Sequence, residues 1–193
     1  MSLAIVYTRA ALGIEAPLIT VEVHLSNGLP GLTMVGLPET TVKEARDRVR
    51  SALINSGYAF PAKKITINLA PADLPKEGGR YDLPIALALL VASEQLNTTR
   101  LNQYEFVGEL ALTGGLRGVP GAIPSAMEAI KAGRRIVVSS DNAAEVGLIG
   151  GSDCLVADHL QEVCAFLAGQ TSLSPPLAEA PARDERYEDL LDV

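Results

Sequence analysis

The chain has 193 residues, 48% of them hydrophobic and 20% charged, which is the balance of an ordinary globular domain. Its formal net charge of −7 argues against a dedicated nucleic-acid-binding domain, for which a basic footprint is expected, although a local basic patch stays possible. The aromatic share of 4%, without any Trp, argues against a stacking platform for single-stranded nucleic acid.

Metal and disulfide chemistry have no signature in the sequence. Cys154 and Cys164 lie ten residues apart, with no CxxC motif and no His at ligand spacing. His24 and His159 are isolated, so we expect each to be an ordinary surface or core side chain. The first residues, MSLAIVYTRAALG, lack a basic leader, and no segment approaches eighteen consecutive apolar residues. We therefore expect a soluble, cytoplasmic protein without a metal site and without a membrane span.

The first third of the chain predicts strands followed by a helix. Residues 3–7, 18–25 and 32–36 are rich in β-branched residues, and turn chemistry at 27–31 predicts a hairpin over 18–36. After Pro38 the apolar period becomes helical, and Gly57 is expected to end this helix. Its predicted buried face consists of Val42, Ala45, Val49, Ala52 and Leu53.

The rest of the chain alternates between strand and helix patterns. We expect strands at 64–69, 105–112, 135–139 and 154–157. Helices are expected at 83–92, where an almost wholly apolar run predicts a buried helix, at 123–132, after Ser140-Asp141-Asn142 through Leu148, and at 160–167. This alternation predicts an α/β or α+β domain in one pair of layers.

The composition changes at Gly169. Residues 169–182, GQTSLSPPLAEAPA, have the Pro, Ala and Ser content of a linker, and residues 183–193 are acidic. We therefore expect one domain over 1–168, with 169–193 forming a linker and tail that lead to a further module outside this chain.

The helix after Pro38 carries four basic residues, which two interpretations explain. Lys43, Arg46, Arg48 and Arg50 are placed to meet a phosphate backbone. However, Glu44 with Arg48 and Lys43 with Asp47 are i,i+4 pairs of opposite sign, which is typical of a solvated helix face. We favour the solvated face and keep Lys43, Arg46 and Arg50, with Lys63 and Lys64, as a possible nucleic-acid surface.

Three segments resemble one bacterial family in their order along the chain. They are GLPGLTMVGLP (28–38) leading into the VKEARDRVRSAL helix, PADLPKEGGRYDLPIALALL (71–90), and GELALTGGLRGVP (108–120). Together they resemble the N-terminal domain of the magnesium-chelatase-like ATPases of the ComM/YifB type. The resemblance covers residues 1–168, and the tail resembles the approach to that family's AAA+ module.

This resemblance implies a fold, a whole-protein activity and a set of partners. The implied fold is that of the Lon proteolytic domain, shared with the second domain of a ribosomal small-subunit protein. The implied whole protein is a ring-forming, hexameric ATPase that uses ATP and Mg in its AAA+ module and performs DNA branch migration in natural transformation. The present chain has no G-x-x-x-x-G-K-[ST] motif, so we expect no cofactor in this part of the protein.

The same resemblance identifies two positions at which the catalytic residues of Lon-type proteases are replaced. Lon-type proteases place a nucleophilic Ser at a helix N-terminus and a Lys base on a later helix. Matching the motifs puts Asp82 in the place of the Ser and Ile123 in the place of the Lys. A Ser–Lys dyad needs a hydroxyl beside a neutral amine, so we expect no peptidase activity, with a hydrolase using loop 75–82 as the alternative. Ser125 and Ser139 remain as hydroxyls without an evident base.

Asp82 also has a structural interpretation that needs no catalysis. If the helix starts at Leu83, Asp82 is its N-cap and its carboxylate accepts a hydrogen bond from the N–H of Ile85, because Pro84 has none. Lys76, Glu77 and Arg80 are expected to solvate a mobile loop. The functional alternative is that Lys76 and Arg80 contact a neighbouring subunit or nucleic acid.

Three hypotheses therefore follow from the sequence. The first is a catalytically silent Lon-like domain that supports assembly and DNA handling by a C-terminal AAA+ motor. The second is a hydrolase that uses the Asp82 loop, and the third is a stand-alone nucleic-acid-binding module. The pair Asp82 and Ile123 disfavours the second, and the acidic net charge disfavours the third.

Overall fold

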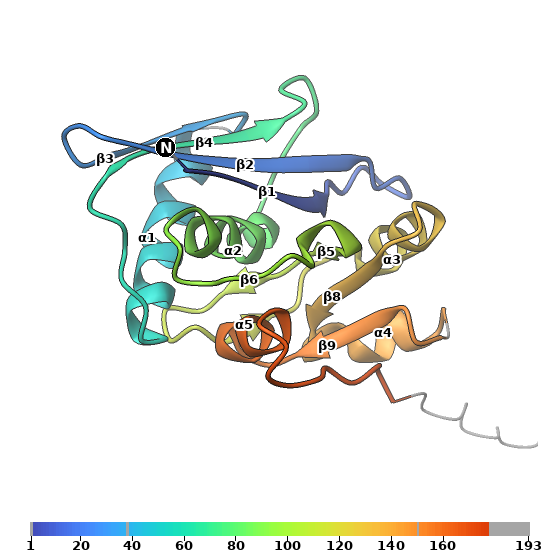
Figure 1. The fold of residues 1–193 in the computed structure, drawn as a ribbon. Coiled ribbons are helices and arrows are strands. Elements are labelled where there is room, and N and C mark those ends of the chain that lie inside the picture. The colour runs from blue at the N-terminus through green and yellow to red at the C-terminus, as the bar shows by residue number, and fades with distance from the viewer. Residues whose placement is uncertain (1, 38, 150, 178–193) are drawn as a thin grey trace, which may run out of the picture.

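The computed structural model describes residues 2–37, 39–149 and 151–177 of the chain, except for the side chains of Glu39 and Val42. It is a single α/β domain built on a mixed seven-stranded sheet in the order β3-β4-β2-β1-β5-β8-β9 (Figure 1). The sheet strands are β1 (Ser2–Arg9), β2 (Leu18–Ser26), β3 (Gly31–Val35), β4 (Lys64–Ala70), β5 (Tyr104–Phe106), β8 (Arg135–Ser139) and β9 (Cys154–Ala157). The α/β class predicted from the alternating patterns is confirmed.

Five α-helices accompany the sheet within the described ranges. They are α1 (Glu39–Asn55), α2 (Asp82–Ala92), α3 (Ala122–Lys131), α4 (Ala143–Gly147) and α5 (Leu160–Leu167), with 3₁₀ turns at Gly79–Tyr81, Leu101–Gln103 and Ser140–Asn142. Helix α2 is buried along nearly its whole length and packs against β1, β2 and α1. The buried helix predicted at 83–92 is thus confirmed.

The predicted hairpin over 18–36 is wrong, because β3 does not pair with β2. Strand β4 lies between them and pairs antiparallel with β2 and parallel with β3. Ile65, Ile67 and Leu69 of β4 are fully buried, which suits a strand inside the sheet. The units β3, α1 and β4 therefore form a βαβ crossover, and the turn at 27–30 reverses the chain without joining neighbouring strands.

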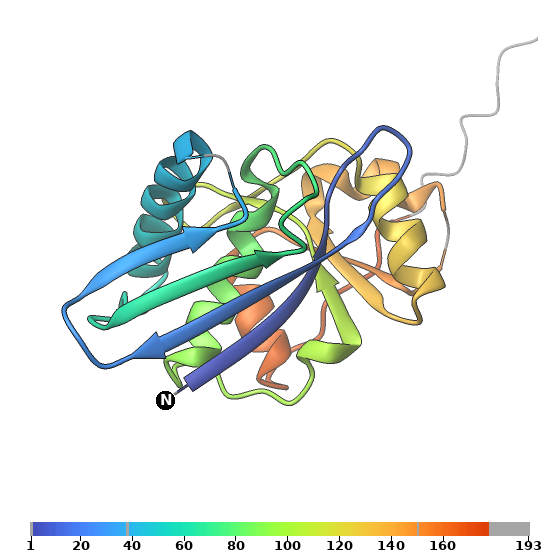
Figure 2. The same ribbon diagram turned by 90° about the horizontal axis from the view of Figure 1, so that it is seen from above.

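The two ends of the sheet are covered differently. In β8, Val137 belongs to the core with α2 and α5, whereas Ile136 and Val138 belong to a second cluster with α3, so helices pack on both faces. Around β1, α1 and α2 cover one face, and the other carries Leu3 and Ile5, which are 62% and 41% exposed. Figure 2 looks onto this open side of β1 to β4.

The predicted strand at 105–112 divides into two elements. β5 ends at Phe106, and β6 (Glu109–Leu110) leaves the large sheet to pair with β7 (Leu116–Arg117). Gly108 marks the change of direction, because its N–H donates to the Arg80 carbonyl at 3.2 Å while its own carbonyl accepts from Leu83. The backbone bonds that would extend β5 are therefore made to the start of α2.

A buried ion pair joins the two parts of the sheet where β1 meets β5. Arg9 donates through Nε and Nη2 to the two carboxylate oxygens of Glu105 at 2.6 and 2.7 Å. Arg134 Nε lies 3.7 Å from the same carboxylate. The carboxylate of Glu105 is fully buried, and no pattern in the sequence indicated this contact.

The described chain remains packed on the domain beyond Gly169. The N–H of Val156 in β9 donates to the carbonyl of Ser174 at 3.0 Å, and Leu173 packs against the core. The first part of the predicted linker therefore lies along the last strand. Residues 178–193 of the predicted tail lie outside the described residues.

Candidate functional site

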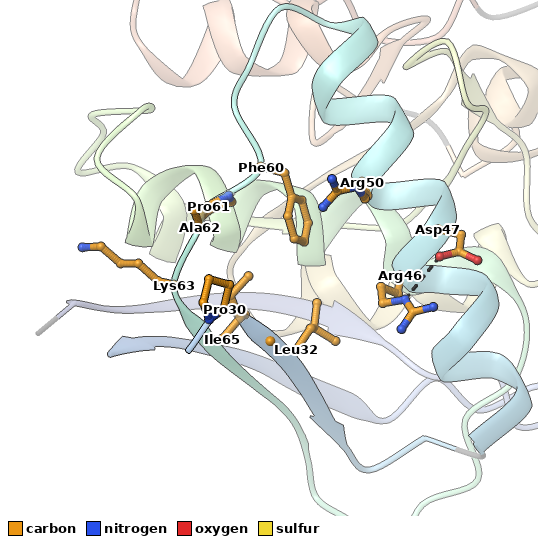
Figure 3. Close-up of a pocket in the computed structure, with 11 residues that line it drawn as sticks. Pro30, Leu32, Arg46, Asp47, Arg50, Phe60, Pro61, Ala62, Lys63 and Ile65 are labelled. Atoms are coloured by element: carbon orange, nitrogen blue, oxygen red, sulfur yellow. Dashed lines mark hydrogen bonds and ion pairs between the residues drawn. The ribbon is translucent and has the colours of Figure 1, made fainter. Parts of the chain in front are cut away.

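A cavity of about 590 Å³ lies between α1, the start of β3 and the segment before β4 (Figure 3). Three residues of the predicted basic surface gather here, namely Arg46 and Arg50 from α1 and Lys63 from the approach to β4. The remaining wall consists of Pro30, Gly31, Leu32, Asp47, Phe60, Pro61, Ala62 and Ile65. We call this cavity the basic groove.

The helical repeat explains the placement of the two arginines. Arg46 and Arg50 are four residues apart, so they share one side of α1, while Ala45, Val49 and Leu53 face the core. The buried face predicted for this helix is confirmed at Ala45, Val49, Ala52 and Leu53, and the side chain of Val42 lies outside the described residues.

Cationic and aromatic groups meet inside the basic groove. The guanidinium of Arg50 lies 5.0 Å from the centre of the Phe60 ring, and Arg46 Nε donates to Asp47 at 3.2 Å. Figure 3 shows Lys63 at the opposite end, with its side chain directed away from Phe60. Three cations with one carboxylate leave a positive excess, which suits a phosphate backbone beside an aromatic face. Phe60 and the two prolines were not singled out from the sequence.

Two other lysines of the predicted basic surface lie outside this groove. Lys43 is exposed on α1, and Lys64 is exposed at the start of β4, but neither lines the cavity. The pair predicted between Glu44 and Arg48 is present at 3.7 Å. The side chain of Arg48 also reaches α2, where it contacts Asp82, so it does not join Arg46 and Arg50 in the groove.

The structure places Asp82 in an ion pair instead of a cap. Tyr81 is the N-cap of α2, with no side-chain capping bond, and Asp82 is the first residue of the helix. Its fully buried carboxylate accepts from Arg48 Nε at 2.6 Å and Nη2 at 3.2 Å, and from the Leu110 N–H at 3.2 Å. The predicted bond from the Ile85 N–H is therefore wrong, because Arg48 reaches across from α1 and orients the carboxylate away from its own helix.

Burial controls the protonation of Asp82. Removal from water raises the pKa of Asp82 to about 6, and the hydrogen bond and charge of Arg48 offset only part of this increase. The pKa of Arg48 is raised by its hydrogen bond to Asp82, which outweighs the lowering effect of partial burial. A carboxylate held in this manner is closed to an incoming substrate.

Lys76 is buried, which corrects the expectation that it solvates a mobile loop. Its side chain is 2% exposed, and Nζ donates to the carbonyls of Pro71 and, at 3.2 Å, Leu74. The ammonium thus closes its own loop and does not present a charge to a neighbouring subunit or nucleic acid. Glu77 is exposed as predicted.

Arg80 is also buried, although it was expected in the same solvated loop. Nη1 donates to the Pro120 carbonyl at 3.1 Å and Nη2 donates to Ser125 Oγ at 2.8 Å. Ser125 in turn donates to the Gly121 carbonyl, and Ser139 bonds Leu116 and Asp141. Both serines are therefore used within the fold.

The other residues weighed as catalytic or metal-binding have structural positions. Ile123 is the second residue of α3 and is half-buried. Cys154 and Cys164 are buried free thiols, and His159 caps α5 by accepting from the Gln161 N–H. Within the described ranges, no three His, Cys, Asp or Glu side chains gather to hold a metal ion.

The described residues contain no helix that is both long and apolar enough to cross a membrane.

Comparison with known proteins identifies one family and several relatives. The model of the family described as subunit ChlI of Mg-chelatase matches residues 21–142. YifB of Salmonella typhimurium, named an uncharacterized protein, is 75% identical over all 193 residues, which are 38% of its own length. YifB of Escherichia coli is 72% identical over the same share.

A third relative is less similar in sequence, but its name states a function. The competence protein ComM of Haemophilus influenzae is 60% identical over 178 residues, which are 92% of this chain and 35% of that protein. This chain therefore spans less than two fifths of the length of the relatives it matches.

Proposed function

Because this chain belongs to the family of subunit ChlI of Mg-chelatase, we propose that it is the non-catalytic, Lon-like N-terminal domain of a ComM/YifB-type AAA+ ATPase. The domain supports assembly of a hexameric ring and guides DNA into it during branch migration. ATP and Mg act in the AAA+ module, for which the greater length of the relatives leaves room.

The basic groove carries the DNA part of this proposal. Arg46, Arg50 and Lys63 come from two separate segments and line one cavity beside Phe60, despite the net charge of −7. Phosphate contacts supply most of the affinity for DNA without reading its sequence. A domain that guides DNA through a motor needs this kind of sequence-independent contact.

Two features of the described residues support the absence of catalysis. The Asp82 carboxylate is enclosed by Arg48 and the Leu110 N–H, so it is not presented as a nucleophile. Ile123, in the place of the base, contributes no amine. The Gly-Gly loop before Arg80 lacks the Lys-Ser/Thr of a nucleotide-binding loop, so this chain does not fit ATP and Mg.

Charge reversal in the groove tests the DNA proposal. We expect the double variant Arg46→Glu, Arg50→Glu of the full-length protein to bind single-stranded and branched DNA at least tenfold more weakly at moderate salt. The slope of log K against log salt should fall by about 0.7 to 0.9 for each lost phosphate contact. Fluorescence anisotropy over a salt series measures both quantities.

Lys131→Glu combined with Arg117→Glu is the matched control, because it changes the net charge by the same four units. Lys131 and Arg117 are both exposed, each pairs with a nearby carboxylate as Arg46 does, and both lie outside the groove. Their reversal should leave affinity and salt slope near the parent values. Equal losses of affinity in the groove variant and the control would mean that net charge alone explains the weaker binding. No loss in the Arg46→Glu, Arg50→Glu variant would show that the groove does not bind DNA.

A further inference from the structure

A second cavity, of about 600 Å³, opens between three loops at the start of α2. Its wall comes from residues 11–13 after β1, from Pro75 and residues 77–80, and from 118–120 after β7, with Glu109 completing it. This volume falls within the range of about 300 to 1,000 Å³ that is usual for small-molecule sites. None of these residues lines the basic groove, so a ligand site in this cavity does not depend on DNA binding there.

A buried cation lies in the wall of this cavity. Arg80 is 4% exposed, and both acceptors that it has, the Pro120 carbonyl and Ser125 Oγ, are neutral. Its Nε–H is buried and has no acceptor within the described chain. A guanidinium has five N–H donors, so this one keeps unused capacity as well as an uncompensated charge.

Arg80 forms no ion pair with any carboxylate of the described residues. Among the described residues, no carboxylate bonds to Arg80, and burial lowers its pKa while only Tyr81 acts in the opposite direction. A buried arginine normally pairs with an anion, as Arg9 does with Glu105 in this molecule. A partner that balances Arg80 would thus be an anion that accepts from a guanidinium, which is the chemistry of carboxylates and phosphates.

The other charges of the cavity limit which anion fits. Glu77 and Glu109 both line it, and Glu77 is exposed and has no ion pair in the described structure. Glu109 forms an ion pair with Arg117, with 3.6 Å between Arg117 Nη1 and Glu109 Oε1. These two carboxylates of the lining repel a doubly charged phosphate, and they favour a ligand that brings one carboxylate together with an N–H donor.

We propose that this cavity is a binding site for an α-amino or α-amido carboxylate, with the carboxylate on Arg80 and the nitrogen donor facing Glu77. Free amino acids and the C-terminal residue of a peptide share this chemistry. The carboxylate supplies the missing counter-ion of Arg80, and the exposed Glu77 discriminates against ligands that lack a donor.

Titration of the 193-residue chain tests the site. The probes are L-alanine and N-acetyl-L-alanine, which separate a free amino acid from a peptide end, with propionate and inorganic phosphate as controls. The readout is the side-chain Nε–H resonance of Arg80 in nitrogen-edited NMR spectra, together with backbone amides of residues 11–13 and 118–121. We expect saturable shifts with at least one alanine probe, at least fivefold weaker binding of propionate, and no saturable shift with phosphate.

Three variants locate the binding. Arg80→Met keeps the aliphatic stem and removes the charge, and Ala11→Phe narrows the cavity from an exposed residue that makes none of the hydrogen bonds of Arg80. Each should weaken the alanine probe at least tenfold in the amide shifts. Glu77→Gln should reduce the preference over propionate. Because Arg80→Met removes two hydrogen bonds, Ala11→Phe serves as the decisive variant if folding fails.

Three results would overturn the assignment of this cavity. The proposal is wrong if neither alanine probe gives saturable shifts, if propionate or phosphate binds as tightly as both, or if Ala11→Phe leaves binding unchanged.

Discussion

Arg9 and Arg80 are buried to nearly the same extent, at 5% and 4% exposure, but their partners differ. Arg9 makes a two-pronged contact with Glu105 and also donates to two carbonyls, so its charge is balanced inside the fold. Among the described residues, Arg80 donates only to neutral oxygens. Burial alone therefore does not separate an arginine that holds the structure together from one that is ready for a ligand. The counter-ion makes that distinction.

The largest effect is expected when Arg9 loses its counter-ion Glu105. Glu105→Gln leaves Arg9 with a buried, uncompensated charge, so we expect the free energy of unfolding to fall by about 3 to 5 kcal/mol. Urea denaturation followed by circular dichroism measures this loss. The exposed Glu15→Gln is the control and should stay within about 0.5 kcal/mol of the parent. A loss at Glu105 as small as that of the control would contradict the assigned role.

Asp82 is an intermediate case, since its counter-ion Arg48 does not fully offset its burial. Its pKa in the fold is about 6, above the ordinary value of 3.8. Between these values the folded state holds a proton that the unfolded state has lost, so the contribution of Asp82 to stability falls as the pH rises from 4 to above 6. The difference is about 3 kcal/mol, at 1.36 kcal/mol for each unit of pKa.

Asp82→Asn removes this titration and retains an acceptor for Arg48 and Leu110. Relative to the parent, the variant should therefore gain about 3 kcal/mol in unfolding free energy between pH 4 and pH 7. Denaturation curves at several pH values give this difference. A constant difference across that range would show that the carboxylate has no raised pKa.

The smallest effect is expected at Arg80 itself. Arg80→Met loses two hydrogen bonds to neutral oxygens but also removes an uncompensated charge, so the loss should be about 1 kcal/mol. This is well below the loss at Glu105, and the same denaturation assay compares them. If Arg80→Met proves as costly as Glu105→Gln, the two arginines hold the fold alike and the contrast between them disappears.

Local sequence patterns predicted where helices and strands lie better than which strands pair. The bounds of β8, β9 and α5 agree with the predicted 135–139, 154–157 and 160–167, because their apolar period and flanking residues are local signals. The pairing of β3 with β4 was missed, since a turn signal says nothing about which strand inserts beside it.

The candidate sites depended even more on distant contacts. Arg46, Arg50 and Lys63 were identified by charge alone, but their presence in one cavity, with Arg50 against Phe60, depends on how α1 packs against the sheet. The burial of Lys76 and Arg80 was missed because a charged, Gly-rich loop normally lies in water, whereas here carbonyls and a serine hydroxyl accept their hydrogen bonds.

The meeting of β1 with β5 has a consequence for synthesis of the chain. β1 leaves the ribosome before β2 and pairs with this neighbour in the chain, but Glu105, which lies on the other side of β1, follows 96 residues after Arg9. Until then the inner edge of β1 is an open strand edge, next to the exposed Leu3 and Ile5. We expect nascent chains of this protein to depend on holding chaperones during this interval, when an unpaired edge is prone to wrong association.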